Sequence, residues 1–495
     1  MDIKTQAQFD EMKTDLALST GGTYQNVPIN IYPLPNNENY ALTSPLKIVK
    51  NNINIIGVDK PKFVMNTTGT DEVNNSIIDI TGDSITGVFS SISSTTTFVK
   101  SSAGWTVNAY TGWVLIFKSG NALNQTRIIS SNTVDTITVS EAFSVTPNGT
   151  SFLIYKPIEN VIIKNLHLVG MGNANANGSN GINIANCGLA HFGNSNQWET
   201  YNRYHAGSIG VNKTTKVGVI IENCDIEECR TSGIRLTEVK NSRFSKNRIF
   251  NNNYYGINLN GYCIENLLYD NVIEKNVTGG GIRFHAQYCF SNNFVGNLIQ
   301  NNGAYGILFA TSYCNNNIFT SNTVQNNNNH GILLNTSDCS NIFTSNTVQN
   351  NNGSGIVVNA NCFNNNFTAN TIQYNYSTGI HLNNAYFNSI TGNNINSNNE
   401  HGIRLYNSSY HNTVSGNIIT NNGLSGVYLD SSSYRNAIAS NNIYGNKDIG
   451  INVYGTTCQY NNIYGNTSQQ NANGNLSLVA GYNNIASTSA NNFIN

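Results

Sequence analysis

The stretch NLIQNNGAYGILFATSYCNNNIFTSNTVQNNNNHGILL, residues 297–334, contains two copies of a pair of short phrases. One phrase is Asn-x-Ile/Val, and the other is Gly followed by Ile or Val. The glycine phrase recurs every 23 to 25 residues, at Gly233, Gly256, Gly281, Gly306, Gly331, Gly355, Gly379, Gly402, Gly426 and Gly450. The asparagine phrase has a different phase, at Asn297, Asn322, Asn346, Asn370, Asn417 and Asn441. A fixed period of this length is typical of a solenoid, in which each repeat stacks on the next.

Each repeat contains short apolar segments with strand periodicity, such as 322–324 and 331–334. We expect the Gly and Asn residues between these segments to form turns with positive φ. Asparagines stacked at one turn can hydrogen-bond to their neighbours above and below, which forms a ladder. The pattern therefore predicts an all-β chain, folded as a parallel β-helix with coils of roughly 24 residues.

The composition indicates a folded chain without nucleic-acid chemistry. Of the 495 residues, 39% are hydrophobic and 10% are charged, and the formal net charge is −1. Such a chain lacks the basic surface that nucleic acids require. No segment is long and apolar enough to span a membrane, and residues 1–15 lack the apolar stretch of a secretory signal. We expect the protein to remain inside the cell or to leave it by another route, such as packaging into a virion.

Departures from the repeat divide the chain into five parts. Residues 1–22 predict an amphipathic helix that covers the first coil and blocks end-to-end association. Residues 23–84 are expected to form the first, irregular coils. Residues 85–157 contain alternating strands without the glycine phrase, and they predict a small inserted β-domain. The main β-helix is expected over 158–460, followed by a polar tail over 461–495.

Five of the nine cysteines recur once per coil, at Cys263, Cys289, Cys314, Cys339 and Cys362. None of them has a local partner of the CxxC type, so they do not indicate a zinc site, and we expect neither a metal nor a cofactor. We predict an interior column of stacked thiols. Because adjacent coils are about 4.8 Å apart, disulfides between them remain geometrically possible.

The chain resembles the pectate-lyase-like superfamily of right-handed, single-stranded parallel β-helices, through the Asn-x-Ile…Gly-Ile-x-Leu coil repeated over residues 161–460. The helix at the N-terminus, the inserted β-domain and the missing signal peptide look like a viral tailspike of that superfamily. The resemblance implies an extracellular protein of the virion tail that binds a cell-surface polysaccharide or glycoprotein glycan. It also implies a homotrimer that contacts other virion tail proteins. Because lyases, hydrolases, epimerases and passive adhesins share this fold, the repeat predicts no particular activity.

Charged residues are concentrated in one window of the shaft, residues 216–285, whereas residues 286–460 are rich in asparagine. From Phe284 to the C-terminus the charged residues are Asp338, Glu400, Arg404, Asp430, Arg435, Lys447 and Asp448. The later coils show that a coil does not need such charges. The window is therefore either an active face or a solvated face with surface ion pairs.

Alignment of neighbouring coils places three carboxylates on one outer strip. Because Ile226 points inward, Asp225 and Glu227 point outward, and the same register adds Arg248 and Glu274 to the strip. In later coils the glutamate position is occupied by residues that cannot transfer protons, namely Gln300, Gln325, Gln349 and Gln373. Glu227 and Glu274 lie two coils apart, about 9–10 Å along the axis, which suits an inverting glycosidase pair. Asp225 and Glu227 suit the shorter separation of a retaining pair, and the sequence does not decide between the two pairs.

Further residues are candidates for substrate binding. Arg235, Arg283 and His285 follow repeat glycines by two or four residues, and with Arg248 they provide groups for binding hydroxyls or carboxylates and for proton transfer. The aromatic-rich segment 191–205 is long for a connection, and its candidates are Trp198, Glu199, Tyr201 and Tyr204. The alternatives are that His285 is an ordinary surface residue and that the aromatic rings pack over the coil beneath.

The favoured prediction is an endo-acting glycoside hydrolase, with Glu227 and Glu274 as acid and base and Asp225 as the next candidate. One alternative is a polysaccharide lyase or epimerase that uses Arg or Lys as the base and a metal held by acids on the same strip. Another is a glycan-binding adhesin without enzymatic activity. The paired Asp, Gly-His-Gly and Arg-Ile-Lys of polygalacturonase-like enzymes are absent, as is the Asp-Pro-His-Asp of alginate epimerases.

Overall fold

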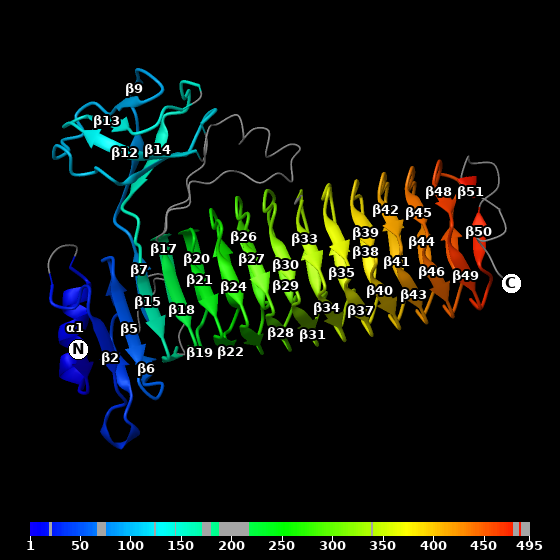
Figure 1. The fold of residues 1–495 in the computed structure, drawn as a ribbon, viewed down its shortest axis with the longest axis horizontal. Coiled ribbons are helices and arrows are strands. Elements are labelled where there is room, and N and C mark those ends of the chain that lie inside the picture. Colours follow the sequence, from blue (N-terminus) through cyan, green and yellow to red (C-terminus); the bar gives the residue numbers. More distant parts are fainter. Residues whose placement is uncertain are drawn as a thin grey trace.

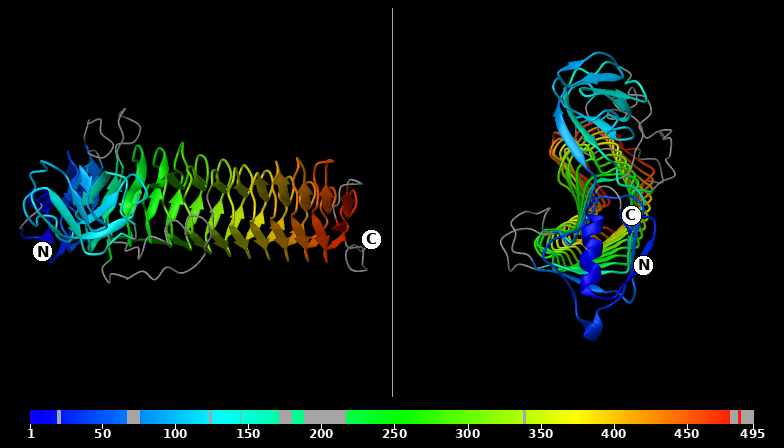
Figure 2. Two further views of the ribbon diagram at one scale, coloured as in Figure 1. Left: turned by 90° about the horizontal axis from the view of Figure 1, so that it is seen from above. Right: turned by 90° about the vertical axis from the view of Figure 1, so that its left-hand side faces the viewer.

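The chain folds into a long solenoid built from three parallel sheets, which we name sheet A, sheet B and sheet C (Figure 1). The computed structural model describes residues 1–18, 22–66, 76–122, 125–143, 145–170, 180–187, 217–337, 340–478 and 485–486. The three sheets have 16, 14 and 14 strands, and a typical coil contributes one strand to each. Figure 2 shows the coils stacked along one axis, with α1 (Gln6–Leu16) at the N-terminal end. The predicted all-β parallel solenoid is confirmed.

The strands of each sheet follow the order of the chain. Sheet A contains β1 (Asp2–Ile3), β2 (Pro28–Ile31), β5 (Ile53–Gly57), β15 (Val161–Lys164), β18 (Val219–Glu222), β21 (Arg243–Ser245), β24 (Leu267–Tyr269), β27 (Asn293–Val295), β30 (Ile318–Thr320), β33 (Ile342–Thr344), β36 (Asn366–Thr368), β39 (Ser389–Thr391), β42 (Thr413–Ser415), β45 (Ala437–Ala439), β48 (Asn462–Tyr464) and β51 (Ile485–Ala486). Sheet B contains β3 (Tyr40–Leu42), β6 (Lys62–Met65), β16 (His167–Val169), β19 (Asp225–Glu227), β22 (Arg248–Phe250), β25 (Val272–Glu274), β28 (Leu298–Gln300), β31 (Thr323–Gln325), β34 (Thr347–Gln349), β37 (Thr371–Gln373), β40 (Asn394–Asn396), β43 (Ile418–Thr420), β46 (Asn442–Tyr444) and β49 (Thr467–Gln469). Sheet C contains β4 (Leu46–Ile48), β7 (Ile78–Thr81), β17 (Ile182–Cys187), β20 (Ser232–Val239), β23 (Tyr255–Asn260), β26 (Ile282–Ala286), β29 (Ile307–Phe309), β32 (Ile332–Leu334), β35 (Ile356–Val358), β38 (Ile380–Asn383), β41 (Ile403–Tyr406), β44 (Val427–Leu429), β47 (Ile451–Val453) and β50 (Leu476–Leu478). Because β48, β49 and β50 continue the three sheets, the segment predicted as a C-terminal tail begins with a further coil.

The repeat glycines are required by close contact between coils and not by their backbone angles. A Cβ atom on Gly355 would lie 2.6 Å from Cγ2 of Ile372 and 2.7 Å from the carbonyl oxygen of Gly379. All ten repeat glycines are described and none has a positive φ, so the prediction of left-handed turns is wrong for them, although it holds for other turn residues such as Gly392 and Asn350. Positive φ occurs instead at the residues directly before the asparagines of the repeat, such as Ser321 and Ser345.

Buried asparagines form three hydrogen-bonded ladders along the solenoid, so the predicted ladder is confirmed and has two companions. The ladders run from Asn247 to Asn466, from Asn252 to Asn471 and from Asn266 to Asn461. In the first ladder the Oδ1 atom of Asn346 accepts hydrogen bonds from the backbone and side-chain nitrogens of Asn322, at 2.9 and 3.0 Å. Each ladder therefore replaces water as the partner of buried turn groups.

The solenoid interior is a continuous apolar column of Ile, Val, Leu, Phe and Cys side chains. Phenylalanines from successive strands of sheet A stack inside it, and the ring centroids of Phe294 and Phe319 are 4.4 Å apart. The eight cysteines in the described residues are buried and none of them forms a disulfide, which confirms the thiol column for the four repeat cysteines among them. The fifth repeat cysteine, Cys339, lies outside the described residues.

Two helical segments and a separate sheet lie outside the three parallel sheets. Helix α1 buries Phe9, Met12 and Leu16, whereas η1 (Pro35–Asn37) buries none of its residues. A separate seven-stranded antiparallel sheet contains β8 (Ser84–Val88), β14 (Ser151–Tyr155), β11 (Val114–Phe117), β12 (Thr126–Asn132), β13 (Thr136–Val139), β10 (Thr97–Val99) and β9 (Ser91–Ile92). It has its own aromatic core and projects from the side of the solenoid (Figure 1). No helix in the described ranges has the length and apolar character needed to cross a membrane.

Candidate functional site

The outer face of sheet B carries the three predicted carboxylates in the expected register. Asp225 pairs with Arg248 on the next strand, whereas Glu227 pairs with Phe250, which in turn pairs with Glu274. The predicted alignment of the coils is therefore confirmed. Glu227 and Glu274 occupy one row of the sheet, two coils apart, with an aromatic ring between them.

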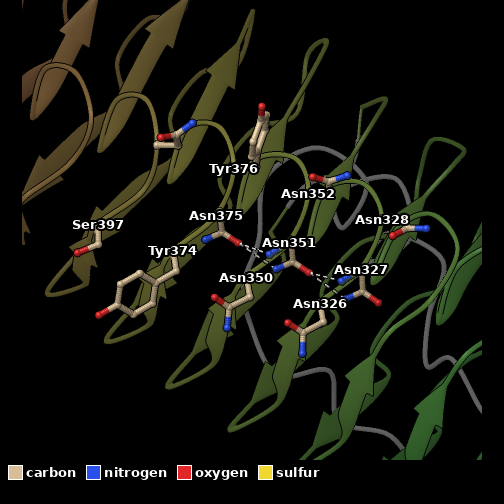
Figure 3. Close-up of a pocket in the computed structure, with 11 residues that line it drawn as sticks. Asn326, Asn327, Asn328, Asn350, Asn351, Asn352, Tyr374, Asn375, Tyr376 and Ser397 are labelled. Atoms are coloured by element: carbon tan, nitrogen blue, oxygen red, sulfur yellow. Dashed lines mark hydrogen bonds between the residues drawn. The ribbon is translucent and has the colours of Figure 1, made fainter.

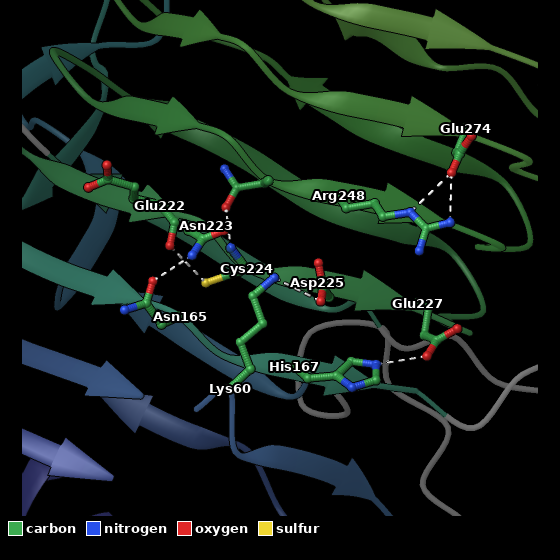
Figure 4. Close-up of polar contacts among 11 residues, drawn as sticks. Lys60, Asn165, His167, Glu222, Asn223, Cys224, Asp225, Glu227, Arg248 and Glu274 are labelled. Carbon is green, nitrogen blue, oxygen red and sulfur yellow. Dashed lines mark hydrogen bonds and ion pairs between the residues drawn. The ribbon is translucent and has the colours of Figure 1, made fainter. Parts of the chain in front are cut away.

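Each of these carboxylates has a cationic or histidine partner (Figure 4). Lys60 contacts Asp225 at 2.9 Å, and the Nε2 atom of His167 lies 2.7 Å from Oε1 of Glu227. Arg248 donates to Oε1 of Glu274 from both Nε and Nη2, at 3.1 and 2.9 Å. These partners come from neighbouring strands of the sheet or from the turn before β6, so the solenoid itself assembles the cluster.

Glu274 also ends a ladder of side-chain amides along sheet B. Gln300 donates to its Oε2 atom at 2.9 Å, and Gln325, Gln349 and Gln373 continue the ladder in later coils. Burial alone would raise the pKa of Glu274, but the hydrogen bonds from Gln300 and Arg248 and the charge of Arg248 lower it below its ordinary value. Glu274 is therefore held as a carboxylate.

Part of the charged window attaches the seven-stranded sheet to the shaft. Lys118, from that sheet, forms an ion pair of 2.5 Å with Glu238 of sheet C. The buried Nζ atom of Lys240 donates to the hydroxyl of Tyr155 at 2.8 Å. These charges hold one sheet against another, so part of the clustering of charge in the sequence has a structural cause.

Arg235 and Arg283 lie on sheet C and not beside the carboxylates of sheet B. They share an outward row with Asn258, and Arg235 donates to Oδ1 of Asn183 at 3.2 Å. The guanidinium of Arg283 lies 4.9 Å from the ring centroid of Tyr255. Within the described part of the chain, Nε of Arg283 and Oδ1 of Asn258 have no hydrogen-bond partner. The two predicted groups of residues therefore occupy the outward faces of two different sheets.

The remaining predicted residues are His285 and the candidates of the aromatic segment. His285 is exposed at an irregularity of sheet C, where Leu259 pairs with Phe284 but Asn260 pairs with Ala286. The candidates of the aromatic segment, Trp198, Glu199, Tyr201 and Tyr204, lie outside the described residues.

A groove that the sequence reasoning missed follows the turn between sheet B and sheet C (Figure 3). Its volume is about 550 Å³, and its lining residues are Asn326, Asn327, Asn328, Asn350, Asn351, Asn352, Tyr374, Asn375, Tyr376, Ser397 and Asn399. Figure 3 shows the buried ladder of Asn327, Asn351 and Asn375 along its middle, with Tyr374 and Tyr376 to either side. These tyrosines are 56% and 67% exposed, at positions that are asparagine in the two preceding coils. That change from Asn to Tyr was the available signal in the sequence.

The lining of the groove contains amides, hydroxyls and aromatic rings but no carboxylate, imidazole or cation. Elsewhere, the described residues contain no group of three or more His, Cys, Asp or Glu side chains placed to hold a metal ion. The arrangement therefore offers a neutral groove suited to hydrogen-bonding and stacking, and a separate charged face suited to proton transfer.

Comparisons with known proteins identify the architecture. The family model described as "Right handed beta helix region" matches residues 151–318 and 361–495. A second model, described as "Periplasmic copper-binding protein (NosD)", matches residues 281–400. No curated protein matches the chain.

Solved structures with a similar fold include the A-module of mannuronan C-5 epimerase AlgE4 from Azotobacter vinelandii, at 12% identity and a TM-score of 0.51, covering 91% of this chain and 95% of that one. They also include the tailspike protein gp49 of Pseudomonas phage LKA1, at 14% identity and a TM-score of 0.41, with coverages of 88% and 73%. The Dettilon tailspike protein has 13% identity and a TM-score of 0.44, with coverages of 90% and 61%. At 12% identity the likeness to the epimerase module shows the fold alone, and the two tailspike likenesses, with TM-scores of 0.41 and 0.44, carry no further argument.

Proposed function

We propose that this chain, which belongs to the family of right-handed β-helix proteins, binds a cell-surface glycan along its shaft and cleaves it internally. One observation carries the proposal: Glu227 and Glu274 share an outward row of sheet B with one strand between them. Two strand spacings separate their backbones by about 9–10 Å, and side chains leaning together reach the separation of an inverting pair. This spacing leaves room for a water molecule beside a sugar ring.

The contacts assign a different role to each carboxylate. Glu274 is the proposed base, because Arg248 and Gln300 keep it ionised while its Oε2 atom, which among the described residues accepts from Gln300 alone, retains a lone pair for water. Glu227 is the proposed acid: it gives its proton to the leaving oxygen, and Nε2 of His167, 2.7 Å from its Oε1 atom, is placed to return a proton to it afterwards. Phe250 between them offers an apolar face to the sugar. Asp225 remains the proposed partner of Glu227 if the reaction is retaining.

Replacement of Glu227 or Glu274 by glutamine is expected to lower glycan cleavage about a hundredfold, because an amide cannot transfer the proton. Release of reducing ends from the bound glycan measures the effect. Glu222→Gln is the matched control, because Glu222 forms its ion pair of 2.6 Å with Lys164 on sheet A. Undiminished cleavage by both sheet B variants would remove the catalytic assignment. A product absorbing in the ultraviolet, or a change of sugar configuration without cleavage, would instead indicate the lyase or epimerase reaction.

The second candidate function is an adhesin that binds glycan without cleaving it. The uncharged groove of Figure 3 favours it, because its exposed tyrosine rings and amides bind sugars without proton transfer. Tyr374→Ala and Tyr376→Ala are each expected to weaken glycan binding about tenfold, through loss of ring stacking. Tyr464→Ala, which removes a tyrosine 44% exposed on sheet A, is the control. Equal glycan affinity for all three variants in a binding titration would exclude the groove as a binding surface.

Several further parts of the proposal concern assembly. We propose that α1 covers the first coil and prevents end-to-end stacking, and that residues 85–157 form a domain of their own. The proposed assembly is a homotrimer that contacts other proteins of a virion tail, outside the cell. Sedimentation of the purified chain tests the trimer directly, because a single 54 kDa species would contradict it.

A further inference from the structure

A smaller pocket, of about 250 Å³, lies on the turn between sheet C and sheet A, toward the C-terminal end of the shaft. Residues from three successive turns line it, namely those before β42, β45 and β48 (Figure 1). Because each coil runs from sheet A through sheet B to sheet C, this turn does not border sheet B. The pocket is therefore separate from the carboxylates of sheet B and from the groove of Figure 3.

The last two of these turns differ in length. Leu429 pairs with Val453 before the turn, and Ala437 pairs with Asn462 after it. The turn that leads to β48 is therefore one residue longer than the turn that leads to β45. Because a longer turn cannot stack on its neighbour residue by residue, these turns leave a hollow between them.

The pocket contains a cation without an acidic partner. Arg435 is exposed, the lining contains no carboxylate, and no carboxylate among the described residues lies within ion-pair distance of the guanidinium. The guanidinium instead lies 5.9 Å from the ring centroids of both Tyr434 and Tyr460. One coil earlier, by contrast, Arg404 donates to the carboxylate of Asp430 at 2.9 Å. The charge of Arg435 is therefore available to an anionic ligand.

Neutral hydrogen-bonding groups surround this cation. The hydroxyls of Ser408, Ser432 and Thr457 and the amide of Gln459 line the same pocket. Each hydroxyl can donate and accept, and the amide has donors and an acceptor. The lining thus suits a ligand that carries several hydroxyls beside one negative charge.

Aromatic rings provide flat apolar surfaces at the pocket. Tyr434 continues a column of stacked rings along the shaft, in which the centroids of Tyr386 and Tyr410 are 4.9 Å apart and those of Tyr410 and Tyr434 are 5.1 Å apart. Tyr460, from the next coil, is 51% exposed. A sugar ring stacks on surfaces of this kind through its apolar face.

We propose that this pocket is a binding subsite for one acidic sugar of a glycan, a sugar that carries a carboxylate. The planar guanidinium of Arg435 matches the two carboxylate oxygens, while the turn hydroxyls bind those of the sugar and Tyr460 packs against its ring. Pockets for larger ligands span about 300–1,000 Å³, so this smaller volume suits a single sugar unit. The inference rests on the proposed glycan binding and names its ligand class. The subsite takes no part in the cleavage proposed for sheet B.

The test applies the full chain to an array of uronic-acid, sulfated and neutral oligosaccharides. The uronic-acid oligosaccharide that binds best is then titrated alongside its methyl ester. Esterification keeps the sugar rings and their hydroxyls but removes the negative charge. It is expected to weaken binding about tenfold, as for loss of a hydrogen bond to a charged group.

Arg435→Asn is expected to weaken binding of the acid about tenfold, for the same reason. Arg435 has a φ of 54°, and Asn364, at the equivalent position of an earlier coil, has a φ of 55°, so this variant is expected to fold normally. Tyr460→Asn is expected to weaken binding about fivefold through loss of ring stacking. Lys447→Asn is the matched control, because it removes an exposed positive charge from the turn between sheet B and sheet C of the same coil.

Each outcome decides the matter. Binding of the acid that falls on esterification and in the Arg435 and Tyr460 variants, but not in the Lys447 variant, supports the subsite. Unchanged affinity in the Arg435 and Tyr460 variants, an equal loss in the Lys447 variant, or binding of neutral or sulfated oligosaccharides alone overturns it. Failure of the wild-type chain to bind any oligosaccharide would overturn both the subsite and the proposed function. Full cleavage by the Glu227 and Glu274 variants would contradict only the catalytic assignment on sheet B.

Discussion

Replacement of Asn346 by leucine is expected to destabilise the shaft by about 4 kcal/mol, since two buried backbone groups lose their partners at about 1–3 kcal/mol each. The side chain of Asn346 donates to the carbonyl of Phe319 and to Oδ1 of Asn370, and it accepts from the backbone N–H of Asn322. Leucine has a similar size but can form none of these hydrogen bonds. The orphaned N–H of Asn322 and the carbonyl of Phe319 then remain buried without water.

Hydrogen exchange provides the sharpest measurement, because unfolding of a repeat protein need not be a single transition. The amide of Asn322 is expected to lose most of its protection, and the denaturation midpoint is expected to fall. Asn352→Leu is the control, since Asn352 is exposed on the next turn of the same coil, after β34. An Asn346 variant as stable as this control would show that the ladder contributes little to stability.

Acidification from pH 7 to pH 4 is expected to destabilise the fold through His381 and His401. Burial lowers the pKa of each to about 4, whereas an unfolded histidine has a pKa of about 6.5. Between these values the unfolded chain binds more protons than the folded chain, so stability is unaffected above about pH 6.5 and falls as the pH drops toward 4. Each histidine contributes up to about 3 kcal/mol of this loss, at about 1.4 kcal/mol per pH unit.

Denaturant titrations at pH 7 and at pH 4.5 measure this loss. The double variant His381→Gln, His401→Gln is expected to lose much less stability between the two conditions than the wild-type chain. Carboxylates contribute acid sensitivity to both proteins, so the difference between them isolates the histidines. His411→Gln, at a half-buried position in the turn before β42, serves as the control. The same loss in the double variant and in the wild type would contradict the expectation.

The register of the coils could be predicted from the sequence because a repeat makes each position comparable with its neighbours. Placing Asp225 opposite Arg248, and Glu227 in line with Glu274, required only the period and the inward direction of the isoleucines. The interpretation of Gln300 was incomplete. It is not only a residue unable to transfer protons, because its amide donates to Glu274 and helps to keep that side chain ionised.

Charge counting along the chain was a poor guide to the sites. Charged residues are concentrated in the window 216–285, yet two of them, Glu238 and Lys240, form contacts that connect the seven-stranded sheet to the shaft. Arg404 and Asp430 were passed over as scattered charges, although the fold brings them into one cluster. Residues about one coil apart in sequence become neighbours when the chain completes a turn, and a local count cannot detect this.

The sequence by itself determined the solenoid, its coil length and its strand register, because these depend on a local pattern repeated at a fixed period. The tertiary structure alone decided why the repeat glycines are needed, which sheet each charged residue faces, and which polar atoms remain without partners. Those outcomes depend on close contacts between coils. A Cβ atom on Gly355 would collide with the next coil. The Oδ1 atom of Asp430 is left without a hydrogen-bond partner among the described residues, although Arg404 lies beside it. Short-range repulsion and hydrogen bonding act on distances in space, which a period in sequence does not specify.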